Sequence, residues 1–160
     1  DMIMAGLAVQ YEGYIATTGF PFVVGKPDDK QIELIDALVA ASDIAVSGLK
    51  AGKRQGDFVK PIKEYFRKMG LERYDLYPPL HGAGLSEAEL PYPNEKTDIP
   101  FLPNTIANTD ISLFCHPAGS NRVEEGLLIT ENGAERLSTV VPKLVNDWKE
   151  IKGIRIQSVL

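Results

Sequence analysis

Five polar residues could carry out chemistry in this sequence: its only two histidines, His81 and His116, and the charged residues Glu89, Arg122 and Glu124. A histidine can transfer protons near neutral pH or bind a metal ion through an imidazole nitrogen. A carboxylate can do either as well, and an arginine binds anions through paired N–H groups. The sequence therefore offers groups for proton transfer, for anion binding or for a divalent metal ion.

Composition limits the class of protein that can use these groups. The chain has 160 residues, a formal charge of -5 and a pI of about 5.1, with 44% apolar residues. This is enough for one domain with a single core. An acidic chain whose longest basic cluster is the short segment Lys50 to Arg54 is not expected to bind nucleic acid. We find no apolar run long enough to cross a membrane and no signal peptide, so we expect a cytoplasmic protein without a membrane partner.

The first half of the sequence predicts a hairpin followed by two helices. Residues 2–10 and 14–24 are apolar or β-branched runs on either side of a turn that contains Gly13. Apolar residues at steps of three and four then predict a long amphipathic helix up to Gly48. A second helix should begin near Asp57 and stop at Gly70.

The second half predicts a proline-rich loop and more strands. The loop spans residues 78–103, a length that often borders a functional pocket. We expect strands over residues 110–115 and 123–130, a short edge strand at 134–138 and a last helix at 142–151. The whole is an α+β arrangement of helices on an antiparallel sheet.

Four local motifs occur in an order and spacing that resemble a known family. They are DMIM with YEGY and FVVG within residues 1–25, LKAG at 49–52, HGAGL at 81–85 followed by Glu89 and Pro91, and NRVEE with LITENGAERL within 121–137. The chain resembles the pita-bread hydrolases, which include methionine aminopeptidase, aminopeptidase P, prolidase and creatinase. The resemblance implies a pita-bread catalytic-type domain over residues 1–138, apparently without its N-terminal portion, and a C-terminal extension over 139–160.

The resemblance also implies which residues would bind metal. Family members that cleave peptides hold two divalent ions with two Asp, one His and two Glu. By motif, the two Asp positions fall on Gly6 and Thr17, and one Glu position falls on His116. His81 and Glu124 occupy the remaining His and Glu positions. We therefore expect an incomplete two-metal site without ordinary two-metal peptidase activity.

The residues that remain leave several interpretations open. His81, His116 and Glu124 could bind one ion of zinc, manganese or iron, because two imidazoles and a carboxylate form a known single-metal site. Alternatively, His116 is only a polar residue that hydrogen-bonds to Glu124.

A metal-free pocket is the second interpretation, and it follows the strategy of creatinase. Here His81, Glu89 and Glu124 would be the acid–base groups, while Arg122 and His116 would contact the substrate. The family's second pocket histidine, next to Glu89, is replaced by Ala88. Arg122 could instead simply pair with Glu124 or Glu125.

These interpretations lead to two candidate functions. The first is a hydrolase that resembles Xaa-Pro dipeptidase or aminopeptidase P but acts on a C–N bond of a small molecule through a mononuclear or metal-free pocket. The alternative is a catalytically inactive pita-bread domain that serves as a binding or scaffold module. In either case we expect a small-molecule or peptide-like ligand, and the family's tendency to associate favours a homodimer.

Overall fold

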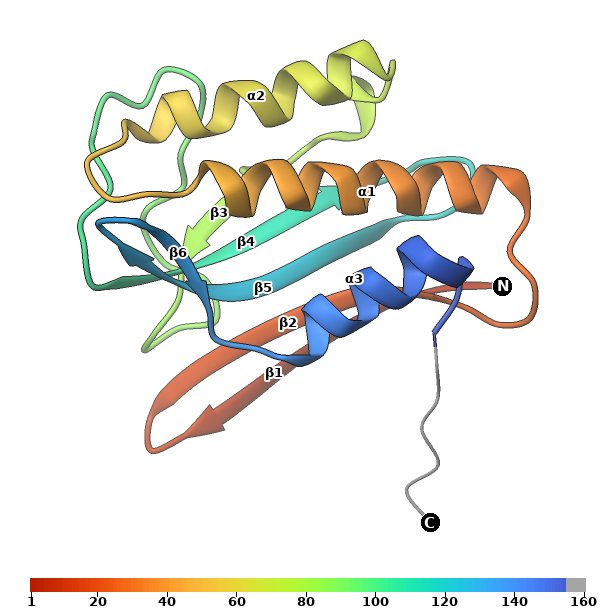
Figure 1. The fold of residues 1–160 in the computed structure, drawn as a ribbon, viewed down its shortest axis with the longest axis horizontal. Coiled ribbons are helices and arrows are strands. Elements are labelled where there is room, and N and C mark those ends of the chain that lie inside the picture. The colour runs from red at the N-terminus through yellow and green to blue at the C-terminus, as the bar shows by residue number, and fades with distance from the viewer. Residues whose placement is uncertain (155–160) are drawn as a thin grey trace.

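A six-stranded antiparallel sheet positions the polar residues of the molecule (Figure 1). The computed structural model describes residues 1–154. The strand order is β1-β2-β5-β4-β3, with β6 paired to β5. The strands are β1 (Met2–Tyr11), β2 (Tyr14–Val23), β3 (Leu80–Gly82), β4 (Thr105–Leu113), β5 (Asn121–Thr130) and β6 (Gly133–Arg136). The helices are α1 (Asp29–Gly48), α2 (Gln55–Lys68), the short 3-10 helix η1 (Glu72–Tyr74) and α3 (Val140–Ile151).

The predicted hairpin of β1 and β2 is confirmed. Its two-residue turn is formed by Glu12 and Gly13, whose φ angles of 49° and 89° both lie in the left-handed region. Such turns match the twist of the two strands, and glycine adopts the conformation without steric cost. The register that follows pairs Tyr11 with Tyr14 and places Gly6 opposite Gly19.

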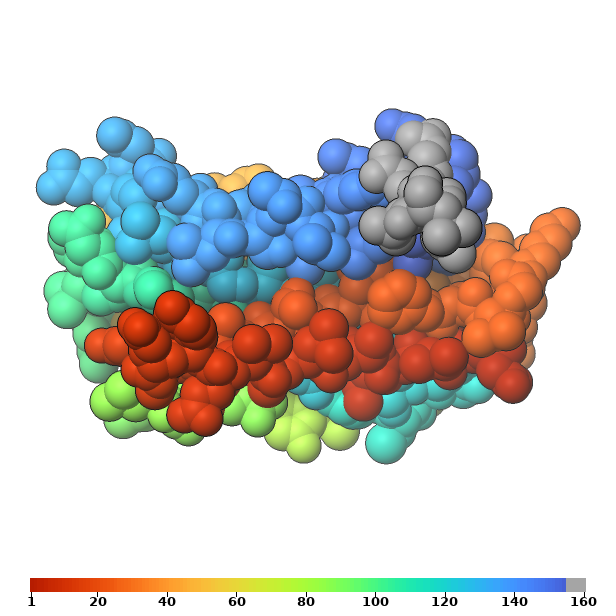
Figure 2. All heavy atoms as spheres, turned by 90° about the horizontal axis from the view of Figure 1, so that it is seen from below, coloured from red at the N-terminus to blue at the C-terminus, as the bar shows by residue number. Residues whose placement is uncertain are grey.

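β1 forms one edge of the sheet over the described residues, because its only strand partner there is β2. Figure 2 shows this strand at the surface along much of the molecule. Leu7, Val9 and Tyr11 are each at least 64% exposed. An open edge with exposed apolar side chains is a surface that other chain segments can cover.

α1 and α2 cover one face of the sheet and supply much of the core. α1 begins with a capping box in which Asp28 accepts from the backbone of Gln31 while the Gln31 side chain accepts from the backbone of Asp28. Its residues Leu34 and Leu38 are buried, and Phe58 of α2 packs in the same core. Within residues 1–154, none of the helices is long and apolar enough to cross a membrane.

β3 and the first half of β4 were not predicted. The expected strand at 110–115 overlaps the second half of β4, which begins at Thr105 and ends at Leu113, two residues earlier than expected. The proline-rich loop contains β3. Asn108 is of a residue type depleted in strands, whereas its neighbour Thr109 is of a type enriched there. In the fold both are buried, and backbone pairing on two sides holds them in the sheet. The missed half-strand has a consequence for the site, because it makes Asp110 a mid-strand residue.

α3 packs on the same core as the rest of the chain. Val141, Val145 and Trp148 belong to the core cluster, and Trp148 Nε1 donates a hydrogen bond to Asp36 of α1 at 2.8 Å. The predicted extension over 139–160 thus begins at a helix that is part of the folded body. Its residues 155–160 lie outside the described part of the chain.

Trp148 should therefore be essential for stability. We expect Trp148→Ala to lower the free energy of unfolding by about 3–5 kcal/mol, since it removes a large buried ring and leaves a cavity. Urea unfolding followed by circular dichroism measures this. Ile151→Ala is the matched control on the same helix, because Ile151 is 50% exposed. Equal losses for the two variants would show that α3 does not dock as described.

Candidate functional site

Three neighbouring strands bring His81, Asp110 and Glu124 together on the face of the sheet opposite the helices. The alternate residues of β4 and β5, such as Ile111 and Val123, belong to the core under the helices, so Asp110 and Glu124 face the other side. Asp110 lies directly opposite Glu124. His81 is opposite Asn108 in the register of β3 and β4. One ligand-type atom from each of the three residues lies within 4.8 Å of the other two.

Glu124 is the centre of this group. Its Oε1 accepts a hydrogen bond from Asn108 Nδ2 at 2.8 Å and lies 3.5 Å from His81 Nε2. Its Oε2 lies 3.3 Å from Nη1 of Arg122. Asn108 also donates to the hydroxyl and the carbonyl of Thr17 on β2. Both carboxylate oxygens of Glu124 are therefore already engaged by N–H donors.

Arg122 links the two carboxylates. Its Nη1 donates to Asp110 Oδ2 at 3.2 Å as well as to Glu124. The predicted pairing of Arg122 with Glu124 is thus present, whereas Glu125 pairs with Arg136. We refer below to His81, Asp110, Arg122 and Glu124 as the charged cluster.

Burial and charge shift the pKa values of the cluster in different directions. Burial raises the pKa of Asp110 to about 6, although the charge of Arg122 opposes this. For Glu124, burial alone would raise the pKa, but hydrogen bonds from His81 and Thr17 and the charge of Arg122 lower it overall. Burial alone would lower the pKa of His81, but the hydrogen bond to Glu124 and the carbonyl of Gly82 raise it.

The contacts of His81 explain its raised pKa. Nδ1 lies 2.9 Å from the carbonyl oxygen of Gly82, which can only accept, so Nδ1 carries a proton. Nε2 faces a carboxylate oxygen of Glu124. A proton on Nε2 turns this second contact into an attraction, which favours the imidazolium. When both carboxylates are ionised and both ring nitrogens of His81 are protonated, the cluster holds two positive and two negative groups.

The structure does not bring His116 into this site. His116 lies in the loop after β4, where its ring packs edge-on against Tyr74 with 4.8 Å between ring centroids. Its Nδ1 accepts from the backbone N–H of Ala118 at 3.1 Å. Neither its predicted role as a metal ligand with His81 nor a hydrogen bond to Glu124 agrees with this placement. Asp110 provides the third ligand-type group instead.

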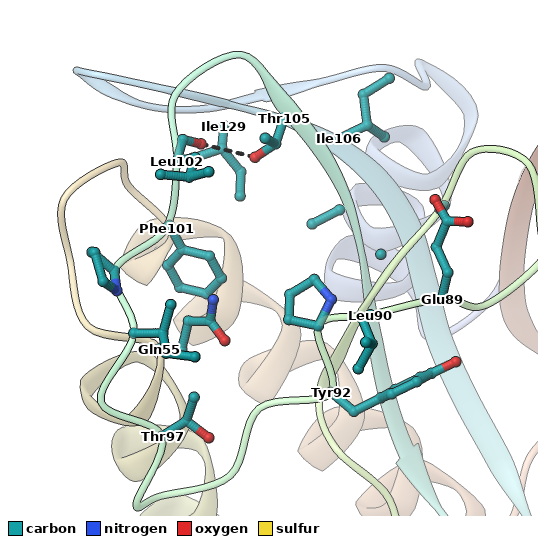
Figure 3. Close-up of a pocket in the computed structure, with 16 residues that line it drawn as sticks. Gln55, Glu89, Leu90, Tyr92, Thr97, Phe101, Leu102, Thr105, Ile106 and Ile129 are labelled. Carbon is teal, nitrogen blue, oxygen red and sulfur yellow. Dashed lines mark hydrogen bonds between the residues drawn. The ribbon is translucent and has the colours of Figure 1, made fainter.

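Glu89 lies in a separate cavity. Its backbone pairs with Gly82, and its side chain lines a space of about 670 Å³. Figure 3 shows Glu89 and Tyr92 on one side of this cavity, across from Gln55 and Phe101. Among the described residues that line it, the charged cluster contributes none. The structure therefore separates Glu89 from the two residues with which it was predicted to act.

A second cavity, of about 520 Å³, borders the cluster. Thr17 and Asn108, which both contact Glu124 or its partners, lie in its wall. The rest of the lining is mainly apolar and comes largely from the hairpin, including Leu7, Val9 and Tyr14. A cavity of this size with a few polar groups suits a small molecule or part of a peptide.

His81, Asp110 and Glu124 lie close enough together to hold one divalent ion, but two other positions that the resemblance assigns to ligands carry no carboxylate. The resemblance places two ligands on Gly6 and Thr17, but Gly6 has no side chain and the Thr17 hydroxyl is bonded to Asn108. The carboxylates of Asp110 and Glu124 already share the guanidinium of Arg122. A metal ion at these oxygens would have to displace N–H donors and lie close to a fixed positive charge.

Comparison with known proteins supports the family assignment. The sequence model of metallopeptidase family M24 matches residues 1–131. An Xaa-Pro dipeptidase from Pyrococcus furiosus is 26% identical over 145 residues, which are 91% of this chain and 42% of that protein. The prolidase structure from the same organism superimposes with a TM-score of 0.80 over 85% of this chain and 40% of that one. The X-Pro aminopeptidase of Thermotoga maritima gives a TM-score of 0.81 at 25% identity, over 86% of this chain and 39% of that one.

The chain belongs to metallopeptidase family M24, and its α+β pita-bread fold is confirmed. It spans about 40% of the length of the relatives it matches. The relatives named above are peptidases, and their family is one of metal-dependent enzymes by name.

The raised pKa of Asp110 should make stability depend on pH. The folded protein holds this proton more tightly than the unfolded chain does, so the contribution is fully present below pH 3.8 and is lost as pH rises through about 6. Burial is the main cause, and His81, Arg122 and Glu124 are the charged groups that face Asp110. We expect Asp110→Asn to be more stable than the wild type near pH 7, by up to about 3 kcal/mol.

Urea unfolding at several pH values measures the difference, which should shrink as the pH falls toward 4. Asp98→Asn is the control, because Asp98 is an exposed carboxylate paired with Arg54, and it should change stability by less than about 0.5 kcal/mol. A constant difference between wild type and Asp110→Asn over this pH range would contradict the assigned pKa.

Proposed function

We propose that the protein hydrolyses an amide or another C–N bond of a small or peptide-like ligand without two-metal chemistry. The charged cluster would be its acid–base site and the cavity beside the hairpin its ligand pocket. Assembly into a homodimer and a cytoplasmic location remain predictions from the sequence.

Two unsatisfied groups in the cluster support this ligand class most directly. Oδ1 of Asp110 and Nε of Arg122 are buried and have no hydrogen-bond partner among the described residues. The first is an acceptor that lacks a donor, and the second is a donor that lacks an acceptor. An amide offers one N–H and one carbonyl oxygen and matches this pair in kind. Both protein atoms are buried, and neither residue lines the cavity beside the hairpin, so a ligand would have to displace part of the wall to reach them. Leaving such groups unpaired costs about 1–3 kcal/mol each, which a matching ligand would recover.

The same residues have the pKa values that acid–base hydrolysis needs. Ionised Asp110 would take a proton from the attacking water, whose oxygen forms a bond to the carbonyl carbon. The imidazolium of His81 would give a proton to the nitrogen as the C–N bond breaks. A base with a pKa of about 6 and an acid with a raised pKa are suited to these roles near neutral pH. A proton passing from Asp110 to His81 through solvent then restores both groups.

A non-catalytic binding module is the second candidate. It is favoured by the internal pairing of the cluster, in which Arg122 and His81 already engage the carboxylates of Asp110 and Glu124. Groups that satisfy each other stabilise a fold without any reaction. The mainly apolar cavity beside the hairpin would then bind a ligand and release it unchanged.

Hydrolysis assays with EDTA distinguish the two candidates. We expect turnover of at least one substrate from a panel of Xaa-Pro dipeptides and small amides, measured by amine release. Asp110→Asn and His81→Gln should each lower kcat/KM by about 100-fold or more, the usual effect of losing a general base or acid. Asp98→Asn, an exposed carboxylate paired with an arginine, should retain activity.

The controls make the result decisive. Ligand-induced shifts in melting temperature, measured on the same panel, report binding without chemistry. Binding without turnover, unchanged in Asp110→Asn and His81→Gln, would refute the hydrolase and support the binding module. Turnover that EDTA abolishes and added metal restores would refute the metal-free site.

A further inference from the structure

Gln55, the first residue of α2, is a buried polar side chain in the wall of the cavity that contains Glu89. It is only 5% exposed, and Figure 3 shows its amide end pointing into this cavity of about 670 Å³. Its Oε1 is buried and has no hydrogen-bond partner among residues 1–154. A buried acceptor without a donor destabilises the folded state, so a ligand that brings a donor to it gains affinity.

The charge of the lining narrows the class of ligand further. Glu89 is the only charged residue among the described residues that line the cavity, and it forms no ion pair within residues 1–154. A carboxylate in this place attracts a cation and disfavours an anion. We propose that the cavity binds a small apolar amine, in which an N–H or O–H group donates to Gln55 and a protonated amine faces Glu89.

The body of such a ligand is apolar because the rest of the cavity lining is mainly apolar. Gln55 lies across the cavity from Glu89 (Figure 3), so a molecule that contacts both carries its polar groups at two ends. The hydroxyls of Thr97 and Thr105 already have hydrogen-bond partners within the protein. A cavity of this volume suits a small molecule with a ring system. The apolar part of its wall includes Leu90, Pro91, Ile99, Pro100, Phe101 and Leu102.

Backbone contacts hold Gln55 in this wall. Its own N–H donates to the carbonyl oxygen of Ile99 at 2.9 Å, and the N–H of Gly56 donates to that of Thr97 at 2.9 Å. A Cβ atom at Gly56 would lie 2.7 Å from the carbonyl oxygen of Glu95, so the start of α2 and this loop are in close contact. The start of the helix cannot move away without breaking both hydrogen bonds, which keeps the Gln55 side chain in the wall.

The amine site is separate from the charged cluster. None of the four residues of the cluster lines this cavity, although Ala83 and Ile106 belong to the walls of both cavities. The proposal therefore goes beyond the proposed function and does not depend on any hydrolytic activity.

Tryptamine is a suitable probe, because its indole N–H can only donate and its amine is protonated at neutral pH. Titration of ¹⁵N-labelled protein in EDTA, followed by NMR, should show saturable binding of about one molecule per chain. The side-chain amide of Gln55 should be among the shifted signals. We expect 1-methyltryptamine, without the N–H, to bind about 5-fold more weakly or less. The neutral 3-ethylindole should also bind more weakly, and the anion indole-3-propionate should not bind.

Two variants test the two polar contacts separately. Gln55→Met removes the acceptor at a similar side-chain length, so it should weaken tryptamine by about 5-fold or more and leave 1-methyltryptamine unchanged. Its melting temperature should not fall, because an unpartnered polar atom is replaced by an apolar one. Glu89→Gln should weaken both amines but not 3-ethylindole. Gln10→Met and Glu87→Gln are the matched controls at exposed positions outside the cavity, and they should change neither affinity.

Three results would overturn the amine site. The first is the absence of saturable binding up to about 10 mM tryptamine, the weakest affinity at which so small a ligand is informative. The second is equal affinity of a folded Gln55→Met protein and the wild type for tryptamine. The third is loss of tryptamine binding in Asp110→Asn but not in Glu89→Gln, which would place the amine at the charged cluster. None of these measurements requires turnover, so the amine site and the hydrolase can fail independently.

Discussion

The direct opposition of Asp110 and Glu124 across β4 and β5 is the constraint around which this face of the sheet is organised. Two like charges placed opposite one another in neighbouring strands repel, and burial increases the cost. Arg122 and His81 offset this by contacting the carboxylates from β5 and β3.

A buried cluster of this kind behaves as a unit. Replacing a whole buried ion pair by apolar groups is often neutral, whereas removing one partner typically costs 3–5 kcal/mol, because a charge is left uncompensated. The neutral residues Thr17 and Asn108 also donate hydrogen bonds to the carboxylate of Glu124, which stabilise its ionised form. In this cluster, pairing offsets the burial of Glu124, whose pKa is lowered, more fully than the burial of Asp110, whose pKa stays raised to about 6. Asp110→Asn is therefore expected to be the exception to this rule near pH 7, because it replaces the poorly compensated carboxylate with a neutral group that can still accept from Arg122.

Membership of family M24 establishes the fold of this chain, but it does not establish which reaction the chain catalyses. The same fold can support different chemistry or none, so activity has to be argued from the site. In this chain the positions that the resemblance assigns to two aspartates are Gly6 and Thr17, and an arginine contacts the two carboxylates that remain together. The chain also spans only about 40% of its relatives, so their activities do not transfer directly.

The sequence by itself determined the elements whose signals are local. A Gly-bearing turn between β-branched runs predicted the hairpin of β1 and β2, and a period of three to four residues predicted α1 and α2. Motif order was enough to predict the family and to select His81 and Glu124, which the fold does bring together.

Only the tertiary structure decided the rest of the site. His116 was predicted to join His81 and Glu124, but it lies beyond the end of β4, while Asp110 takes that place. The clearance above Gly19, through which Arg122 reaches both carboxylates, also had no local signal. The physical reason is that strand register pairs residues distant in the chain. Which side chains meet therefore depends on hydrogen bonds between strands, and motif spacing along one strand does not specify those bonds.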